Sequence, residues 1–297
     1  MARPITPKES YAVRLNRVVD YIDTHLSEPL RLEELASQAA FSPFHFHRLF
    51  RAWFGETLQD FVRRRRLESA ASQLKYAPHH SIGHIALEAG FNSAEGFARA
   101  FRRHFDMSPS AWRNGGAATW GDQVRAPSDR NGLVEERTYS VLAERVRVVV
   151  LPEVQVAYQR AIGPYNETVR PLWGRFSSWY GALGLENETC YGMGLDDPSI
   201  TPAEHRRYDA CITIPAGTRL PTKTPVKVIA GGPHAILDYE GSPMDVGAGW
   251  IALFADWLPS SGFEVIDHPC MDRFSAGLPK FDAPNFRCEL CVPLYSL

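Results

Sequence analysis

Cysteine is scarce in this sequence and unevenly placed. The 297 residues include five cysteines, and the first of them is Cys190. An odd number of thiols confined to the later part of the chain argues against a secreted scaffold held together by disulfide bonds. The opening residues, MARPITPKES, are polar and lack the apolar core of a secretory leader. We therefore expect a cytoplasmic protein with reduced thiols.

Long apolar runs and a strong net charge are also missing. No run approaches the roughly 20 apolar residues that a membrane-spanning helix needs, so no membrane partner is expected. The formal net charge is only −2, but residues 1–115 carry 16 basic and 12 acidic side chains, whereas the remainder carries 16 and 22. A basic half joined to an acidic half is typical of a nucleic-acid-binding unit fused to a different domain.

Residues 32–54 contain two short amphipathic patterns separated by a break. Apolar residues recur at helical spacing from Leu32 and again from Phe46. Between them, Ser42 followed by Pro43 is typical of a helix N-cap with proline at the first helical position. Two short helices joined by a tight turn indicate a helix-turn-helix.

The polar face of the second of these helices carries side chains suited to DNA. Arginine can bond guanine O6 and N7 as a fork, histidine can donate to base edges or phosphates, and phenylalanine can touch a thymine methyl group. A solvated outer face of a small helical bundle has a similar appearance. The candidate DNA-contacting residues of this helix are Phe44, His45, His47, Arg48 and Arg51.

An internal repeat favours the DNA-binding interpretation. The pattern of residues 35–54 returns at residues 85–105, with one extra residue in the turn. Each recognition helix ends where a left-handed residue would suit, at Gly55 in the first copy and at Asp106 in the second. The sequence therefore predicts two helix-turn-helix units, each with an arginine on its outward face.

The second unit differs from the first at the entrance of its recognition helix. Glu95 there either accepts a hydrogen bond from cytosine N4 or repels phosphate, so we expect weaker binding or fewer bases read. The candidate DNA-contacting residues of this unit are Glu95, Ala98, Arg99 and Arg102.

Residues 58–76 form one long helical pattern between the two units. A helix of roughly 20 residues is about 30 Å long, close to the ~34 Å between successive major-groove faces of DNA. Such a helix can hold two reading helices one DNA turn apart. The four arginines at 63–66 cover every side of it, so some should pair with Glu56, Asp60 or Glu68, while one or two are candidates for phosphate contacts.

The composition changes after the repeat. Residues 116–137 are rich in Gly, Ala, Pro, Ser, Asn and Asp, which predicts a linker. Residues 138–297 alternate strand patterns with two amphipathic helices, and FRCELCVP near the end echoes YDACITIP. We therefore predict a multidomain protein: an all-α domain with two helix-turn-helix units in residues 1–115, and an α+β domain of two pseudo-symmetric halves in residues 138–297. A cleft between the halves is a natural place for a ligand.

The last strand carries a carboxylate among apolar residues. Side chains alternate along a strand, so Cys288 faces the core while Glu289 and Cys291 face the other side. Glu289 can hold a cationic or polar ligand, or it can simply be solvated on an open sheet face. The two cysteines point to opposite faces and cannot share a metal ion, so neither a metal nor a cofactor is expected. The candidate ligand-binding residues are Tyr165, Trp173, Tyr239, Trp250 and Glu289.

Residues 11–113 resemble the duplicated DNA-binding domain of the AraC/XylS family of bacterial transcription regulators. The resemblance is carried by ELA-x4-FS-P-x2-F-x-R-x-F and by the longer run IGHIALEAGFNSAEGFARAFRRHFDMSPSAWR. It implies that both recognition helices contact double-stranded promoter DNA and that RNA polymerase is a partner.

Residues 145–297 resemble the GyrI-like family of small-molecule-binding domains. The segments that carry this resemblance are LPEVQVAYQRAIGPY, DDP, RYDACITIP, GGPHAILDYEG, DWLPSSGFE and CELCVPL. It implies two βαββ-type halves around a ligand cleft, with Glu289 at the position of a glutamate that several members place there. A DNA reader joined to this domain is similar to the Rob-type regulators.

The leading hypothesis is a DNA-binding transcription regulator whose second domain binds a small aromatic or cationic effector. A first rival is hydrolysis of a small electrophile with Glu289 as base, although no Ser-His-Asp arrangement is suggested and no catalytic residue is assigned. A second rival is a module that docks on another protein. Two reading helices in one chain allow a monomer to bind DNA, so a monomer or weak dimer is expected.

Overall fold

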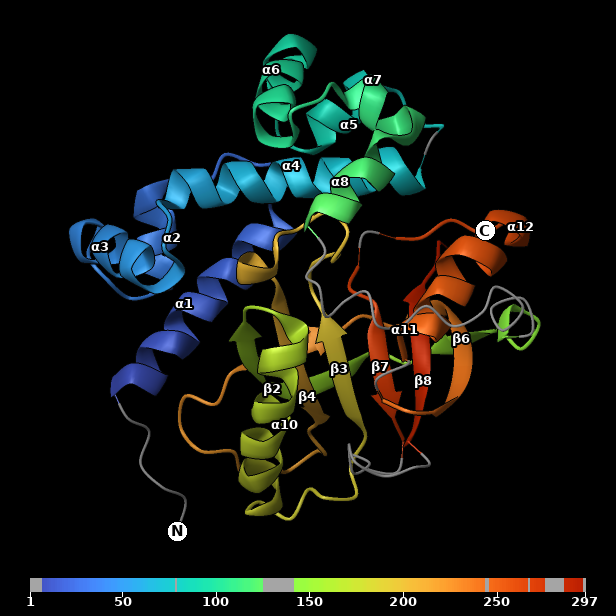
Figure 1. Cartoon of the computed structure of the whole chain (residues 1–297). Helices are drawn as coiled ribbons and strands as arrows, with labels where there is room; N and C mark the ends of the chain where they lie inside the picture. Colours follow the sequence, from blue (N-terminus) through green and yellow to red (C-terminus); the bar gives the residue numbers. More distant parts are fainter. Residues whose placement is uncertain are drawn as a thin grey trace. The chain divides into compact units, whose positions relative to one another are not determined.

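The computed structural model describes residues 7–77, 79–124, 142–243, 246–266, 268–275 and 286–295. The chain divides into two compact units, Met1–Gln123 and Val124–Leu297 (Figure 1). The first is helical and the second is built on a sheet, which confirms the predicted fold class. None of the described helices has the length and apolar character that a bilayer crossing requires.

Two pairs of short helices pack along one long helix in the first unit. Helix α4 has 19 residues, which corresponds to about 28 Å, and Thr57 caps it by accepting a hydrogen bond from the Asp60 amide at 3.2 Å. Figure 1 shows α2 and α3 at one end of α4, with α5 and α6 further along it. The helices are α1 (Pro7–Thr24), α2 (Leu32–Gln38), α3 (Pro43–Phe54), α4 (Leu58–Tyr76), α5 (Ile82–Glu88), α6 (Ala94–Phe105) and α7 (Pro109–Ala111).

Each helix pair has its own phenylalanine-rich core. Phe46 and Phe50 of α3 are fully buried against α1, α2 and Phe61 of α4. In the second pair, Phe97, Phe101 and Phe105 are buried, and the ring centroid of Phe105 lies 4.5 Å from that of Trp112. Burial of each such side chain contributes on the order of 1.5–3 kcal/mol, so these rings hold the reading helices in place.

The predicted linker over residues 116–137 does not begin where composition suggested. A kinked segment, η1 (Trp112–Gly116), whose backbone is non-helical at Asn114 and Gly115, leads into α8 (Ala117–Val124). The Trp120 ring centroid lies 5.1 Å from that of Phe105, so this tryptophan extends the apolar packing beyond the predicted boundary. The rest of the predicted linker, residues 125–137, falls outside the described residues.

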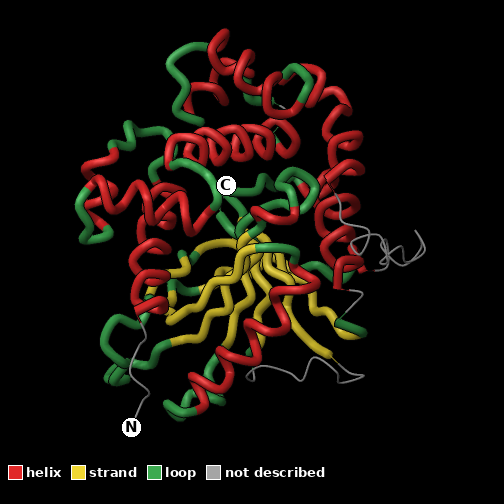
Figure 2. Tube along the Cα trace, turned by 60° about the vertical axis from the view of Figure 1, so that its left-hand side comes forward, coloured by secondary structure: helices red, strands yellow, loops and turns green. Residues whose placement is uncertain are grey.

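The second unit contains one antiparallel sheet in the order β1-β6-β8-β7-β3-β4-β2-β5. Figure 2 shows the strands in yellow, with a long helix lying across them. The strands are β1 (Arg147–Leu151), β2 (Val154–Ile162), β3 (Cys190–Gly194), β4 (Arg207–Thr213), β5 (Val226–Ile229), β6 (Gly232–Gly241), β7 (Met271–Phe274) and β8 (Phe286–Pro293). The helices are α10 (Tyr165–Gly181), η3 (Ala203–His205), α11 (Val246–Ile251), η4 (Ala252–Trp257) and α12 (Leu258–Ser261).

The sheet contains the predicted duplication. Its inner six strands form two strand-helix-strand-strand halves, β2-α10-β3-β4 and β6-α11-β7-β8, which meet where β3 pairs with β7. The edge strands are exchanged: β1 precedes β2 in the chain but pairs with β6, and β5 precedes β6 but pairs with β2. The pairing of β3 with β7 makes the two halves one continuous sheet, and each half also supplies the outer edge strand of the other.

The two faces of this sheet differ. Helices α10 and α11 cover one face, here called the helix face, and the other is called the open face. As the alternation along β8 predicts, Cys288 belongs to the core of the helix face, whereas Cys291 joins Tyr191 and Met271 in an apolar cluster on the open face. The cysteine pair therefore lies on opposite sides of the sheet.

Candidate nucleic-acid interface and effector site

Helix α3 turns its apolar side inward and its polar side outward. Its N-cap Ser42 accepts a hydrogen bond from the His45 amide at 3.4 Å, and Gly55 closes the helix with a φ of 77°. The residues predicted from the sequence to contact DNA are all exposed: Phe44, His45, His47, Arg48 and Arg51.

The exposed side of α3 is basic and includes one large apolar side chain. His47, Arg48 and Arg51 line a shallow depression on it, and in the described part of the chain neither arginine has a carboxylate partner. Phe44 is 67% exposed, and the guanidinium carbon of Arg48 lies 5.7 Å from its ring centroid. This side therefore offers donors to phosphates and base edges, and an apolar contact to a thymine methyl group.

Helix α6 presents an equivalent but more acidic side. Ser93 caps it through the Gly96 amide at 3.1 Å, and Asp106 closes it in the left-handed region with a φ of 55°, as predicted. Its first turn contains an acid, Glu95, whereas the first turn of α3 contains none. The predicted DNA-contacting residues are exposed at Glu95, Arg99 and Arg102 and half-buried at Ala98.

The arginines of α4 pair with carboxylates, as predicted. Arg63 contacts Asp60 at 2.6 Å on the surface, and the buried Arg64 contacts Glu56 at 2.6 Å and Glu68 at 3.0 Å. Burial acts to lower the pKa of Arg64, but the charges of Glu68 and Glu56 raise it overall. Arg64 is thus held charged inside the unit, where it cannot reach phosphate.

The next two arginines tie α4 to α1 and the loop after it. Arg65 contacts Asp23 at 3.0 Å, and Arg66 donates hydrogen bonds to the carbonyls of Leu26 and Glu28 at 2.8 and 2.7 Å. These partners lie far away in sequence, so the local spacing did not reveal them. Arg64, Arg65 and Arg66 therefore stabilise the packing of the first unit. A phosphate contact remains a prediction for the exposed Arg63.

Glu289, the acid singled out from the sequence, lies on the open face between two arginines. Its carboxylate accepts hydrogen bonds from Arg147 and Arg273, both at 2.7 Å, and from Ser275 at 3.1 Å. Arg147 also contacts Asp238 at 3.1 Å. Because two arginines balance two carboxylates, the cluster offers a cationic ligand no net negative charge.

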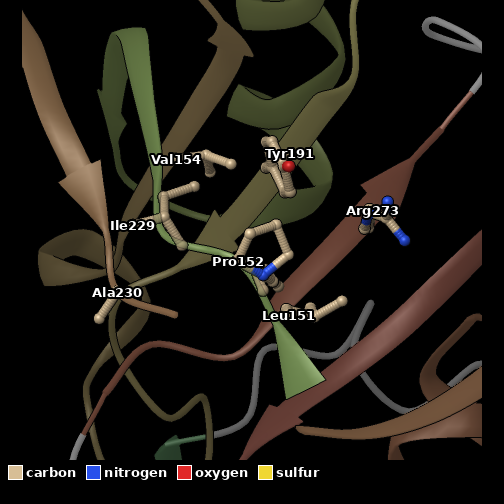
Figure 3. Close-up of a pocket in the computed structure, with 8 residues that line it drawn as sticks. Leu151, Pro152, Val154, Tyr191, Ile229, Ala230 and Arg273 are labelled. Atoms are coloured by element: carbon tan, nitrogen blue, oxygen red, sulfur yellow. The ribbon is translucent and has the colours of Figure 1, made fainter. Parts of the chain in front are cut away.

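The open face also has a small cavity where the exchanged edge strands leave the sheet (Figure 3). Its volume is about 20 Å³, which is enough for about one water molecule. Figure 3 shows Pro152 and Tyr191 facing each other there, with Arg273 to one side. The lining residues are Leu151, Pro152, Val154, Tyr191, Ile229, Ala230, Met271 and Arg273. An aromatic effector does not fit this space.

The five residues predicted to bind the ligand are not brought together. Tyr239 pairs with Cys288, the neighbour of Glu289, and neighbouring positions on a strand face opposite sides of the sheet. The four aromatic candidates pack into the core of the helix face, away from Glu289: Tyr165, Trp173, Tyr239 and Trp250. The sequence pattern assigned the four aromatic residues and Glu289 to one site, although they lie on opposite faces of the sheet.

A different acid lies on the helix face near these aromatic residues. Asp272 of β7 pairs with Gly192 of β3 where the two halves meet. A methyl group on Gly192 would lie 1.9 Å from the Tyr208 hydroxyl and 3.2 Å from Oδ2 of Asp272, so glycine leaves room for both groups. The Trp173 indole donates a hydrogen bond to that hydroxyl at 3.2 Å. Oδ1 of Asp272 is buried and has no hydrogen-bond partner among the described residues.

The surroundings of Asp272 change its acidity. Burial raises the pKa of Asp272 to about 7, and the nearby Tyr208 hydroxyl and Trp250 indole, which act to lower it, only partly oppose this. Burial also raises the pKa values of Tyr208, Cys270 and Cys288, so these neighbours stay neutral near pH 7. Asp272 is therefore a carboxyl group poised to ionise when a positive group approaches.

The alternation of side chains along β7 could have identified Asp272 from the sequence. Asp272 lies two positions before the buried Phe274 and so shares its face of the sheet. An acid facing the same way as a core phenylalanine is unusual and indicates a functional group. The strand itself, with four residues, was too short to recognise from its pattern.

Comparison with known proteins identifies both units. Residues 35–115 match a helix-turn-helix domain, and residues 144–294 match the GyrI-like small molecule binding domain. YbfP of Bacillus subtilis, an uncharacterized HTH-type transcriptional regulator, is 37% identical over 103 residues, which cover 35% of this chain and 35% of YbfP. The transcriptional regulator Rob of Salmonella typhimurium is 24% identical over 285 residues, covering 92% of this chain and 95% of Rob.

Among solved structures, the DNA-binding domain of the global transcriptional factor AdpA, in complex with a target DNA, is 30% identical. The match covers 36% of this chain and 95% of that chain, with a TM-score of 0.34. The GyrI-like match alone spans more than half of the sequence. The chain therefore belongs to the GyrI-like small-molecule-binding family and joins that domain to an AraC-type DNA-binding domain, the architecture of a Rob-type transcription regulator.

Proposed function

We propose that an aromatic cation binds at Asp272 on the helix face, and that this effector controls the binding of promoter DNA by α3 and α6. The observation that carries the proposal is the buried Oδ1 of Asp272, which has no partner among the described residues. Trp173 of α10 and Trp250 of α11 belong to the two halves and supply aromatic surfaces near it. A cation beside these rings gains both an ion pair and cation–π attraction.

Glu289 is the weaker candidate for an effector contact. Its carboxylate oxygens already accept hydrogen bonds from Arg147 and Arg273, so a cationic ligand would have to displace an arginine. The same two contacts disfavour Glu289 as the base of a hydrolase. On the DNA side, RNA polymerase is the expected protein partner, and a monomer with two reading helices suffices to span one operator.

The proposal is tested by titration calorimetry of the full chain with tetraphenylphosphonium and, as a probe of opposite charge and similar shape, tetraphenylborate. We expect the cation to bind more tightly, and Asp272→Asn to weaken its binding at least tenfold, or about 1.4 kcal/mol. The matched variant Glu289→Gln should change the affinity less than twofold. Loss in Glu289→Gln with no change in Asp272→Asn would place the site on the open face instead.

The pH dependence gives a second, independent signature. With a pKa of about 7, Asp272 is mostly protonated at pH 6 and mostly ionised at pH 8. Since a cation binds the ionised form, its affinity should rise roughly tenfold over that range, with proton release on binding at pH 6. Asp272→Asn should abolish this dependence. A flat profile in the unmodified protein would rule out Asp272 as the ligand's counter-ion.

A further inference from the structure

We propose a site for a divalent transition metal at the start of the second helix-turn-helix, formed by His80, His84 and Glu88. The three residues are spaced four apart, His80 just before α5 and the other two on it. One ligand atom from each lies within 4.8 Å of the others, and His84 Nε2 lies 3.3 Å from a Glu88 carboxylate oxygen. No metal was expected from the sequence, where only the cysteine pair was considered.

The separation between His84 and Glu88 matches coordination geometry. Zinc bonds of about 2.0–2.1 Å at tetrahedral angles place two ligand atoms about 3.3–3.4 Å apart. The His84–Glu88 pair already has this separation, and a ligand atom of His80 lies within 4.8 Å of both. The side chains of His84 and Glu88 are each 50% exposed, so a water molecule can occupy a fourth position.

The backbone around His80 is held in place. Arg113 donates a hydrogen bond to the His80 carbonyl at 2.7 Å, and the His80 amide donates to the Ala77 carbonyl at 3.2 Å. Ser81 caps α5 through the His84 amide at 3.1 Å. The His80 and His84 rings lie with centroids 5.1 Å apart. Metal binding therefore requires mainly side-chain rotation, which keeps its entropic cost low.

Two imidazoles and one carboxylate define the class of metal. This donor set suits Zn²⁺, Co²⁺, Ni²⁺ and Cu²⁺, whereas Mg²⁺ and Ca²⁺ prefer oxygen ligands throughout. A bound ion would join the segment between α4 and α5 to both ends of α5. It would thus fasten the first helix of the second reading unit, a role separate from that of the effector domain.

The experiment uses the full chain, treated with a chelator and free of any affinity tag. We expect Zn²⁺ titrated by calorimetry to bind with one ion per chain at this site, and Co²⁺ to give a visible spectrum of nitrogen and oxygen ligation without thiolate bands. His84→Ala and Glu88→Gln should each weaken binding at least tenfold. Both side chains are half exposed, so circular dichroism should show that the variants stay folded.

Two matched variants test whether Zn²⁺ binds to another histidine or to a cysteine instead of this site. His47→Ala removes an exposed histidine on α3, and Cys270→Ser removes a thiol that is only partly buried. Neither should change the affinity for Zn²⁺. The proposal fails if Zn²⁺ does not bind, if it binds His84→Ala and Glu88→Gln as well as the unmodified chain, or if Cys270→Ser abolishes binding.

Discussion

The two helix-turn-helix units share the positions of their left-handed residues but place different residues there, and the second turn is one residue longer. Each has a left-handed position in the turn before its recognition helix and another at the end of that helix. In the first unit these are Ala40, with a φ of 52°, and Gly55, with a φ of 77°. In the second they are Gly90, with a φ of 77°, and Asp106, with a φ of 55°. A non-glycine residue there costs about 1–2 kcal/mol, so each unit contains one relaxed and one strained position.

The neighbours of the turn explain which residue is tolerated. A methyl group on Gly90 would lie 2.4 Å from the Leu26 carbonyl oxygen and 2.8 Å from the guanidinium carbon of Arg66. The first turn accommodates the methyl group of Ala40, and Arg14 donates a hydrogen bond to its carbonyl oxygen. The duplication therefore kept the left-handed position in the turn, while packing determined whether glycine was required.

Gly90→Ala should have the largest effect on stability. The variant combines left-handed strain of about 1–2 kcal/mol with a clash against backbone, so we expect a loss of about 3 kcal/mol or more in the free energy of unfolding. Urea unfolding followed by circular dichroism measures this. The matched variant Gly55→Ala has no atom within 4 Å of the added carbon and should lose only about 1–2 kcal/mol. Equal losses would contradict the packing argument.

The recognition helices should differ in how much they contribute to DNA affinity. Arg48→Ala should weaken binding to an operator selected from random duplexes by about 1–3 kcal/mol, because a bidentate contact to guanine is lost. Arg99→Ala should cost less, since Glu95 makes the side of α6 more acidic. Fluorescence anisotropy on selected and random duplexes measures both.

The control for this comparison is Arg287→Ala, which removes an exposed arginine paired with Glu240 on the sheet of the second unit. It should change the affinity for selected and random DNA by less than either recognition-helix variant. If Arg48→Ala weakens both kinds of DNA equally, Arg48 contacts phosphate and does not read bases.

Local sequence was sufficient to predict the helical unit. Ser42 and Thr57 mark helix starts, and the repeat identified the left-handed positions Gly55 and Asp106. These signals work because caps and amphipathic faces depend on residues within a turn or two. The sequence placed the start of the linker before α8, because Trp120 is a single apolar residue whose partners lie elsewhere in the unit.

The sheet was only partly predictable because strand pairing is non-local. The duplication and the two faces of β8 followed from periodicity, but the exchange of β1 and β5 between the halves has no local signal. The prediction of the ligand-binding residues was limited by the same lack of information on strand pairing. Glu289 was grouped with aromatic residues that pack on the opposite face, and Asp272, which lies on their side, was overlooked.

Ala40→Gly should stabilise the first unit and sharpen the comparison of the turns. Relief of about 1–2 kcal/mol of left-handed strain exceeds the about 0.4–1 kcal/mol by which glycine stabilises the unfolded chain, so a gain of about 0.5–1 kcal/mol is expected. Thermal and urea unfolding measure it. The neighbouring Ala39, with a φ of −82°, provides the control: glycine relieves no strain there and removes a buried methyl group, so Ala39→Gly should destabilise by about 1–2 kcal/mol.

The smallest expected effect concerns the one acid on a recognition surface. In the internal repeat, Glu95 corresponds to Phe44. The negative charge can therefore be removed from the second recognition helix, or added at the same position of the first. If Glu95 only repels phosphate, Glu95→Gln should tighten binding to random DNA two- to threefold, or about 0.5 kcal/mol, and Phe44→Glu should weaken it by a similar factor. If Glu95 instead accepts a hydrogen bond from cytosine N4, Glu95→Gln should weaken binding to the selected operator while still tightening binding to random duplexes. Anisotropy at two salt concentrations separates these outcomes, because simple repulsion fades as salt rises and a base contact does not.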